Sequence, residues 1–314
     1  MTEEKNQTLH TFSDLKEEFL EYLASIKGFS PNTVAGYRND LERLEKSVGG
    51  NTGIQSITLA QLRACVSDMS RRKYAPASIN RFIASVHRLF AYCKKNHYIE
   101  VNMSLELKSV KQPKRLPKFM TQSEIDELCL APEKNKLLWP VRDKAIFEML
   151  YSSGCRVSEL ASLKFSDFSE DYGSALIMGK GHKERYVFFE DDARKALRDY
   201  LAERDILFPQ ARKGAGGEVQ EVFLNQKGTA LTPQGIELIV RRYSGIEGTN
   251  NPMTPHAFRH TFATAMLMNG ADIREVQAML GHSSINATQR YTHVTLDRLK
   301  EVYDQAFPHS GKQD

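Results

Sequence analysis

Seven side chains between residues 156 and 291 of the 314-residue sequence could do chemistry together. They are Arg156, Glu159, Lys180, His256, Arg259, His282 and Tyr291. Arg156 and Glu159 are spaced i, i+3, as are His256 and Arg259, so each pair lies on one face of a helix. The set offers permanent positive charge, imidazoles that exchange protons near neutral pH, and a phenol.

Other reaction classes lack their residues. The sequence has no G-x-x-x-x-G-K-[ST] loop, which argues against a P-loop ATPase. His256 and His260 have the spacing of a zinc helix, but Ala257 stands where H-E-x-x-H requires glutamate. No tight cluster of Asp and Glu is present to hold two magnesium ions. We therefore predict chemistry without ATP, without a metal and without any other cofactor.

The elements that must position these residues are mostly helical. Thr121-Gln-Ser-Glu124 matches a capping box and opens a new domain. A β-hairpin is predicted where 175–178 and 185–189 flank the turn Gly179-Lys180-Gly181-His182. A second, short hairpin is expected near 222–231. The helices are predicted near 136–152, 156–164, 191–204, 232–244, 254–269, 272–280, 284–292 and 295–306.

The N-terminal part is predicted to be a four-helix bundle. Ser13 or Asp14 can cap the first helix, which ends at Gly28. Ser30-Pro31 opens the second, Thr58 the third, and Pro76 or Ser78 the fourth, which ends near Asn96. The fold class is thus mainly α with two domains: 1–110, a linker over 111–118, and a mixed α+β domain over 119–314 that ends in the helix 295–306.

Charge is concentrated in one segment. The formal net charge is +4, but residues 71–118 carry 12 basic and 2 acidic side chains, a local excess of +10. Such a positive field suits a polyanion, because each neutralised phosphate releases counterions. A solvated helix face followed by a charged linker explains the pattern equally well. The candidates for DNA binding in this segment are Arg71, Arg72, Lys73, Arg81, Lys94, Lys95, Lys114 and Arg115.

Composition bounds the class of protein. Hydrophobic residues make up 41% and charged residues 26%, which is typical of a folded globular chain. No apolar run reaches the roughly 18 residues of a membrane span, and the polar, acidic start does not resemble a secretory signal. The four cysteines are scattered without a C-x-x-C pair, which favours reduced thiols. We expect a cytoplasmic protein with no membrane contact.

Four strings of sequence together resemble the signature of the tyrosine recombinases. They are SGCRVSELASLK, MGKGHKERYV, TPHAFRHTFAT and MLGHSSINATQRYTHV. The resemblance spans about residues 119–305, and six reactive positions agree in order and spacing. The segment from Gly28 to Tyr37 is also similar to the core-binding, SAM-like domain of this family. The length and two-domain layout resemble the bacterial Xer type.

The resemblance implies a role for each reactive residue. Tyr291 would attack a DNA phosphodiester and form an O-(3′-phospho-DNA)-tyrosine intermediate. Arg156 and Arg259 would stabilise charge on the non-bridging oxygens. His256 and His282 would donate hydrogen bonds to the same oxygens or accept the phenol proton. Lys180 would protonate the leaving oxygen, and Glu159 would orient the basic groups.

The resemblance also implies partners. They are double-stranded DNA with inverted-repeat half-sites and a homo- or hetero-tetramer on two duplexes that passes through a Holliday junction. The helix 295–306 would be exchanged between protomers or pack on its own domain. A second recombinase and a septal DNA translocase are further implied partners, with chromosome dimer resolution as the function. The alternatives are a phage or mobile-element integrase, a type IB topoisomerase-like enzyme, and a DNA-binding regulator with a relic site.

Overall fold

The chain folds as two compact units, Met1–Leu116 and Pro117–Asp314, each with its own hydrophobic core. The computed structural model describes residues 10–112, 120–135, 137, 139–179, 184–211, 219–244, 254–281 and 296–308. Most of the predicted linker 111–118 lies outside these residues. Helices dominate both units, and the only sheet among the described residues is one hairpin, which confirms the predicted fold class.

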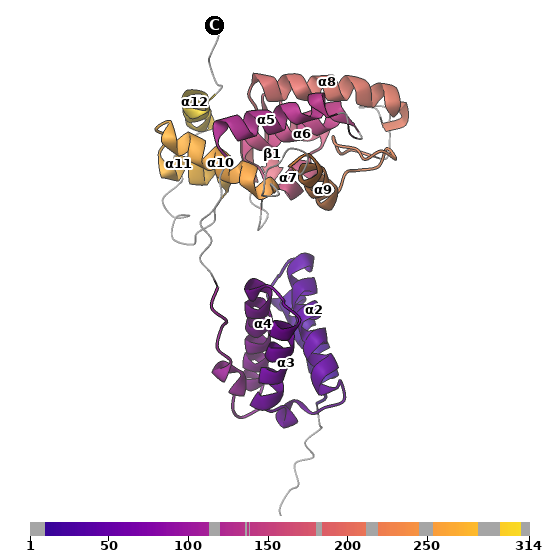
Figure 1. Ribbon diagram of the computed structural model, residues 1–314, viewed down its shortest axis with the longest axis vertical. Coiled ribbons are helices and arrows are strands. Elements are labelled where there is room, and N and C mark those ends of the chain that lie inside the picture. The colour runs from indigo at the N-terminus through magenta and orange to yellow at the C-terminus, as the bar shows by residue number, and fades with distance from the viewer. Residues whose placement is uncertain are drawn as a thin grey trace, which may run out of the picture. The chain divides into compact units, whose positions relative to one another are not determined.

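The N-terminal unit contains four long helices, as predicted (Figure 1). They are α1 (Phe12–Glu21), extended by a π-helical turn over Tyr22–Ile26, α2 (Pro31–Val48), α3 (Leu59–Arg71) and α4 (Pro76–Lys95). Short 3-10 turns cover Ile54–Ser56 and Met103–Glu106. Ser30 caps α2, and Thr58 forms a capping box with Gln61 at α3. The predicted cap of α1 was wrong, because Thr11 accepts from the Asp14 N–H and the helix begins at Phe12.

The C-terminal unit is also mainly helical. Its helices are α5 (Gln122–Lys134), α6 (Pro140–Ser153), α7 (Val157–Ala161), α8 (Asp191–Leu207), α9 (Pro233–Ser244), α10 (Pro255–Met268), α11 (Ile273–Leu280) and α12 (Leu296–Ala306). Short 3-10 turns cover Phe165–Asp167 and Pro209–Ala211. The Thr121–Glu124 capping box is confirmed. The helix predicted near 136–152 begins later, at Pro140, and the helix predicted near 156–164 ends at Ala161.

The predicted hairpin is confirmed with its register. Strand β1 (Ser174–Met178) pairs antiparallel with β2 (Glu184–Phe188), and Ala175 lies opposite Val187, both buried. Alternation along β2 turns Arg185 and Val187 to the same face. The hairpin expected near 222–231 is reduced to one antiparallel bridge, between Leu224 and Ala230.

Helix α6 lies at the centre of the C-terminal unit and packs against α5, α8 and α10 (Figure 1). Its side chains are buried from Ala145 to Ser153, all round the helix, as expected for an element enclosed by others. Helix α12 packs on its own unit, where Tyr303 donates to the Ser152 carbonyl at 3.0 Å and Phe307 packs against Tyr151. The C-terminal end of α6 is thereby held in place by several contacts.

All four cysteines are buried and form no disulfide. Burial raises the pKa of Cys155 to about 11, so this thiol stays protonated at neutral pH. Among the described residues, no helix is both long and apolar enough to cross a bilayer.

Candidate active site

Arg156 is placed by a sharp turn between α6 and α7. Gly154 ends α6 in the left-handed conformation, with φ of 57°. A Cβ there would lie 2.5 Å from Phe262 Cδ1, so the turn requires glycine on two grounds. Arg156 then becomes the N-cap of α7, and Glu159 accepts its backbone N–H at 2.7 Å. The chain therefore presents Arg156 at the start of a helix with its carboxylate partner one turn on.

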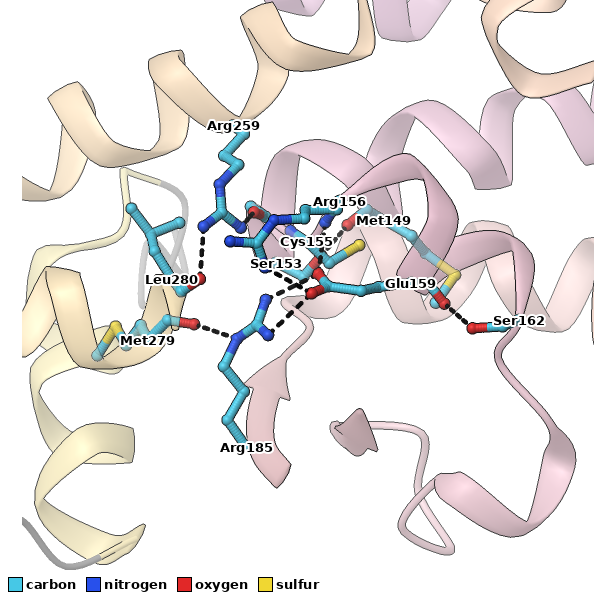
Figure 2. Close-up of polar contacts among 11 residues, drawn as sticks. Met149, Ser153, Cys155, Arg156, Glu159, Ser162, Arg185, Arg259, Met279 and Leu280 are labelled. Carbon is cyan, nitrogen blue, oxygen red and sulfur yellow. Dashed lines mark hydrogen bonds and ion pairs between the residues drawn. The ribbon is translucent and has the colours of Figure 1, made fainter. Parts of the chain in front are cut away.

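Glu159 collects donors from two arginines. Its carboxylate accepts from Arg156 Nη1 at 2.7 Å, from Arg185 Nη1 at 3.0 Å and from Arg185 Nη2 at 2.8 Å (Figure 2). Burial alone would raise the pKa of Glu159, but the Arg185 and Arg156 hydrogen bonds and charges outweigh it and lower the pKa. Glu159 is therefore ionised at neutral pH and holds both guanidiniums.

Arg259 reaches the same place from α10. Its Nη1 donates to the Gly154 carbonyl at 2.8 Å, and its Nη2 donates to the Leu280 carbonyl (Figure 2). The residue is only 5% exposed. Burial, together with the charges of Arg156 and Arg185, lowers the pKa of Arg259 to about 10, which still leaves it protonated at neutral pH. A guanidinium has five N–H donors, so three remain after these two bonds.

His256 lies one turn before Arg259 on α10. Its ring meets the His260 ring edge-on, with centroids 4.9 Å apart. Burial, His260 and the nearby arginines lower the pKa of His256 below its usual value. Its imidazole is therefore mainly neutral at pH 7 and can both donate and accept a hydrogen bond.

Arg156, His256 and Arg259 line one cavity of about 420 Å³. The full lining is Cys155, Arg156, Val157, Ser158, Glu237, Arg241, Thr254, Pro255, His256 and Arg259. Arg156 and Arg259 bring fixed positive charge and His256 brings a neutral imidazole. Such a cavity can bind an anion and stabilise negative charge that develops on it.

The structure brings together four of the predicted site residues. Arg156, His256 and Arg259 line the cavity, and Glu159, which does not line it, accepts a hydrogen bond from Arg156. Lys180, His282 and Tyr291 lie outside the described residues.

The predicted DNA-binding residues differ in their surroundings. Arg71 and Arg72 both pair with Asp68, at 2.7 and 2.8 Å, while Lys73, Lys94 and Lys95 are exposed. Arg81 donates from its guanidinium to the buried Asp40 at 2.9 and 3.0 Å, and its side chain is 61% exposed. Lys114 and Arg115 lie outside the described residues.

Sequence reasoning missed Arg185, Glu237 and Arg241. The last two line the cavity from α9. Arg185 bonds to Glu159, 26 positions earlier, and to Met279, 94 positions later, so no local spacing indicates its partners. One signal was available: Arg185 alternates in phase with the buried Val187, so a cation falls on the inner face of a strand.

Comparison with known proteins gives consistent matches over nearly the whole chain. The model of the phage integrase family matches residues 118–298, and that of the phage integrase N-terminal SAM-like domain matches residues 17–97. The tyrosine recombinase XerC of Treponema denticola is 38% identical over 95% of this chain and all of that protein. XerC of Herpetosiphon aurantiacus is 39% identical over 92% of this chain and 93% of that protein.

Solved structures share the fold. The Tn1549 transposon integrase in complex with transposon right end DNA has a TM-score of 0.70 at 19% identity, over 93% of this chain and 98% of that chain. The XerH recombinase bound to its difH substrate has a TM-score of 0.64 at 24% identity, over 93% of this chain and 83% of that chain. The chain thus shares its fold with both of these solved structures. This chain belongs to the phage integrase family and, within it, to the Xer-type tyrosine recombinases, which are site-specific recombinases.

Proposed function

We propose that this chain cuts and rejoins DNA at a specific site through a covalent bond between Tyr291 and a 3′ phosphate. One observation carries the proposal: Arg156, His256 and Arg259 line a single cavity, and each guanidinium is held by Glu159 or by backbone carbonyls. Membership of the tyrosine recombinases supports the assignment of the nucleophile to the string that contains Tyr291.

In the cleavage step the Tyr291 oxygen attacks phosphorus and the bond from phosphorus to the 5′ oxygen breaks. The phenol proton passes to His256 or His282, and Lys180 gives a proton to the leaving 5′ oxygen. Negative charge grows on the two non-bridging oxygens, where Arg156 and Arg259 stabilise it. The neutral imidazole of His256 suits either hydrogen bonding or proton acceptance.

Rejoining is the reverse reaction with a different 5′ hydroxyl. Because the phosphotyrosine bond replaces the phosphodiester bond, strand exchange requires neither ATP nor metal. Each duplex is cut and rejoined one strand at a time, with a Holliday junction between the two exchanges.

We place four protomers on two duplexes with inverted-repeat half-sites. A lambda integrase tetramer bound to a Holliday junction shares this fold, with a TM-score of 0.67 at 18% identity, over 90% of this chain and 83% of that chain. In the single chain α12 packs on its own unit through Tyr303 and Phe307. In the tetramer we expect α12 to pack on a neighbouring protomer instead.

The biological role that fits best is resolution of chromosome dimers in the cytoplasm during cell division. The support is that relatives of 33–39% identity over most of the chain are XerC recombinases. The tetramer contains either this chain alone or a second recombinase as well, and a septal DNA translocase would activate it.

The test is recombination of the host's replication-terminus DNA. Two duplexes carrying the site, one labelled, are incubated with the protein in EDTA and without ATP. We expect labelled recombinants and covalent complexes that map to one position. Relaxation of supercoiled DNA without a preferred site would favour the topoisomerase-like alternative, and activity lost on chelation would contradict the mechanism.

A further inference from the structure

Arg185 on β2 joins three elements around the cavity without lining it. Its Nε donates to the Met279 carbonyl at 2.8 Å, and its Nη1 and Nη2 donate to the two carboxylate oxygens of Glu159 (Figure 2). The side chain is only 10% exposed. One planar guanidinium therefore ties β2 to α7 on one side and to the end of α11 on the other.

The end of α11 is held by two arginines. Met279 and Leu280 are its last residues, and their carbonyls have no partner within the helix. Arg185 donates to the first and Arg259 to the second. Two cations at a helix C-terminus also interact favourably with the helix dipole. The direction in which the chain leaves α11 is thus set by the same two side chains.

Gly281 completes this junction. It adopts the left-handed conformation, with φ of 66°, and a Cβ there would lie 3.0 Å from Arg185 Nη1 and 3.2 Å from its Cζ. The backbone therefore passes directly over the Arg185 guanidinium. The next residue along the chain is His282, one of the six proposed catalytic residues.

Arg185 also fixes the orientation of Arg156. Because Arg185 binds both oxygens of Glu159, the carboxylate cannot rotate about its own axis without losing a bond. Arg156 makes one side-chain hydrogen bond among the described residues, from Nη1 to that carboxylate. Its remaining donors are free to face the cavity. A turn of Glu159 would move Arg156 with it.

We propose that Arg185 is a positioning residue for strand cleavage. It contacts neither DNA nor the reacting atoms, but holds Arg156 through Glu159 and sets where the chain bearing His282 and Tyr291 leaves α11. This inference rests on the proposed function, since it assumes that those residues react.

The variant Arg185→Gln tests the proposal. With a suicide DNA substrate at saturating concentration, we expect the single-turnover rate of covalent complex formation to fall roughly 10²-fold, since a displacement of about 1 Å in a site has that effect. DNA affinity should stay within about twofold of wild type. Arg185→Lys keeps the charge but loses the fork, so we expect it to remain at least roughly tenfold slow.

A matched control is Arg142→Gln. Arg142 is also a buried arginine, donating to the Asp143 carboxylate and to the Leu224 carbonyl at 3.1 Å, but it does not line the cavity. Both variants should lower the melting temperature. Measured below both melting temperatures, only Arg185→Gln should slow cleavage. An equal loss in the two variants, or a wild-type rate in Arg185→Lys, would overturn the proposal.

A second substrate separates the effect of Arg185 from that of Lys180, which lies between β1 and β2 in the sequence. Sulfur in place of the leaving 5′ oxygen needs little protonation, so this substrate should restore cleavage by Lys180→Ala. It should not restore cleavage by Arg185→Gln, and restoration would show that Arg185 acts through Lys180 instead. If wild-type protein forms no covalent complex with either substrate, the proposed function itself fails.

Discussion

The two arginines of the cavity are fixed before any substrate arrives. Arg156 is held by Glu159 at 2.7 Å, and Arg259 is held by carbonyls at the ends of α6 and α11. Positive charge is therefore in place where negative charge would develop, and little reorganisation is needed during the reaction. The low exposure of Arg259 strengthens its effect, because water screens it weakly.

Arg259→Lys should abolish most activity although it keeps the charge. An ammonium cannot span the Gly154 and Leu280 carbonyls and still offer a fork to a phosphate. We expect covalent complex formation to slow by roughly 10²–10³-fold, the usual effect of removing one such donor. Single-turnover cleavage at saturating DNA measures this. A rate within a few-fold of wild type would show that charge alone suffices.

The buried carboxylates of Glu148 and Glu190 predict that the stability of the fold depends on pH. Burial, together with Asp192 and Glu148, raises the pKa of Glu190 to about 8, far above its value of 4.5 in an unfolded chain. Below pH 4.5 both states are protonated and no penalty arises. As pH rises to about 8 the unfolded state ionises first, so Glu190 increasingly destabilises the fold.

Glu190→Gln should therefore stabilise the protein more at pH 8 than at pH 5, on the order of 2–4 kcal/mol at the higher pH. Denaturant unfolding at both values measures the difference. Asp199→Asn, at an exposed position of α8, is the control and should change little. A gain that is equal at pH 5 and pH 8 would contradict the raised pKa.

At the scale of elements, Gly154 forms the turn that connects α6 to α7. Gly154→Ala should destabilise the C-terminal unit by roughly 3 kcal/mol, the sum of a left-handed alanine and a clash with Phe262. Gly270 also has positive φ but nothing within 4 Å of a Cβ, so Gly270→Ala should cost only about 1 kcal/mol. Chemical denaturation of both variants measures the difference between their free energies of unfolding. Equal losses of stability would show that the clash with Phe262 contributes nothing.

Most elements could be predicted because their signals are local. The capping box at Thr121 and the alternation of β1 and β2 each need only a few neighbouring residues. The start of α1 was placed two residues late, because Thr11, Ser13 and Asp14 are all good caps and sequence alone does not rank them. The short α7 was overextended, because the chain leaves the helix after Ala161 and Lys164 instead pairs with the distant Glu221 in an antiparallel bridge.

The site could be predicted only in part, for the opposite reason. The spacing of Arg156 with Glu159 and of His256 with Arg259 indicates two helical pairs. That the pairs share a cavity depends on α6, α7 and α10 meeting, and the contacts of Arg185 join residues up to 94 positions apart. Tertiary packing creates those contacts, and no pattern within a single element contains them.

At the scale of the whole molecule, the charge of residues 71–118 is partly balanced by acidic side chains elsewhere in the N-terminal unit. Asp68 pairs with Arg71 and Arg72, and Asp40 pairs with Arg81. The net charge of +4 does not reveal the local excess of +10. Because of these ion pairs, the excess of +10 in turn overstates the positive charge available to a DNA duplex. Lys73, Lys94 and Lys95 are exposed to solvent.

Replacing Arg71, Arg72 and Lys73 together by alanine should weaken DNA binding and flatten its salt dependence. Each lost phosphate contact lowers the slope of log K against log salt by about 0.9. Asp68→Asn leaves the two arginines without their carboxylate and should act oppositely, tightening binding at low salt. Titrations at several salt concentrations measure both variants. An unchanged slope in the triple variant would remove these residues from the interface.

The most direct test of the central claim is to identify the residue that becomes joined to DNA. Wild-type protein is trapped on suicide DNA, digested with protease, and the DNA-linked peptide is sequenced by mass spectrometry. We predict a 3′-phosphate bonded to Tyr291, and for Tyr291→Phe normal DNA binding without any adduct. A covalent adduct in Tyr291→Phe, or attachment to a different residue in the wild-type protein, would contradict the account.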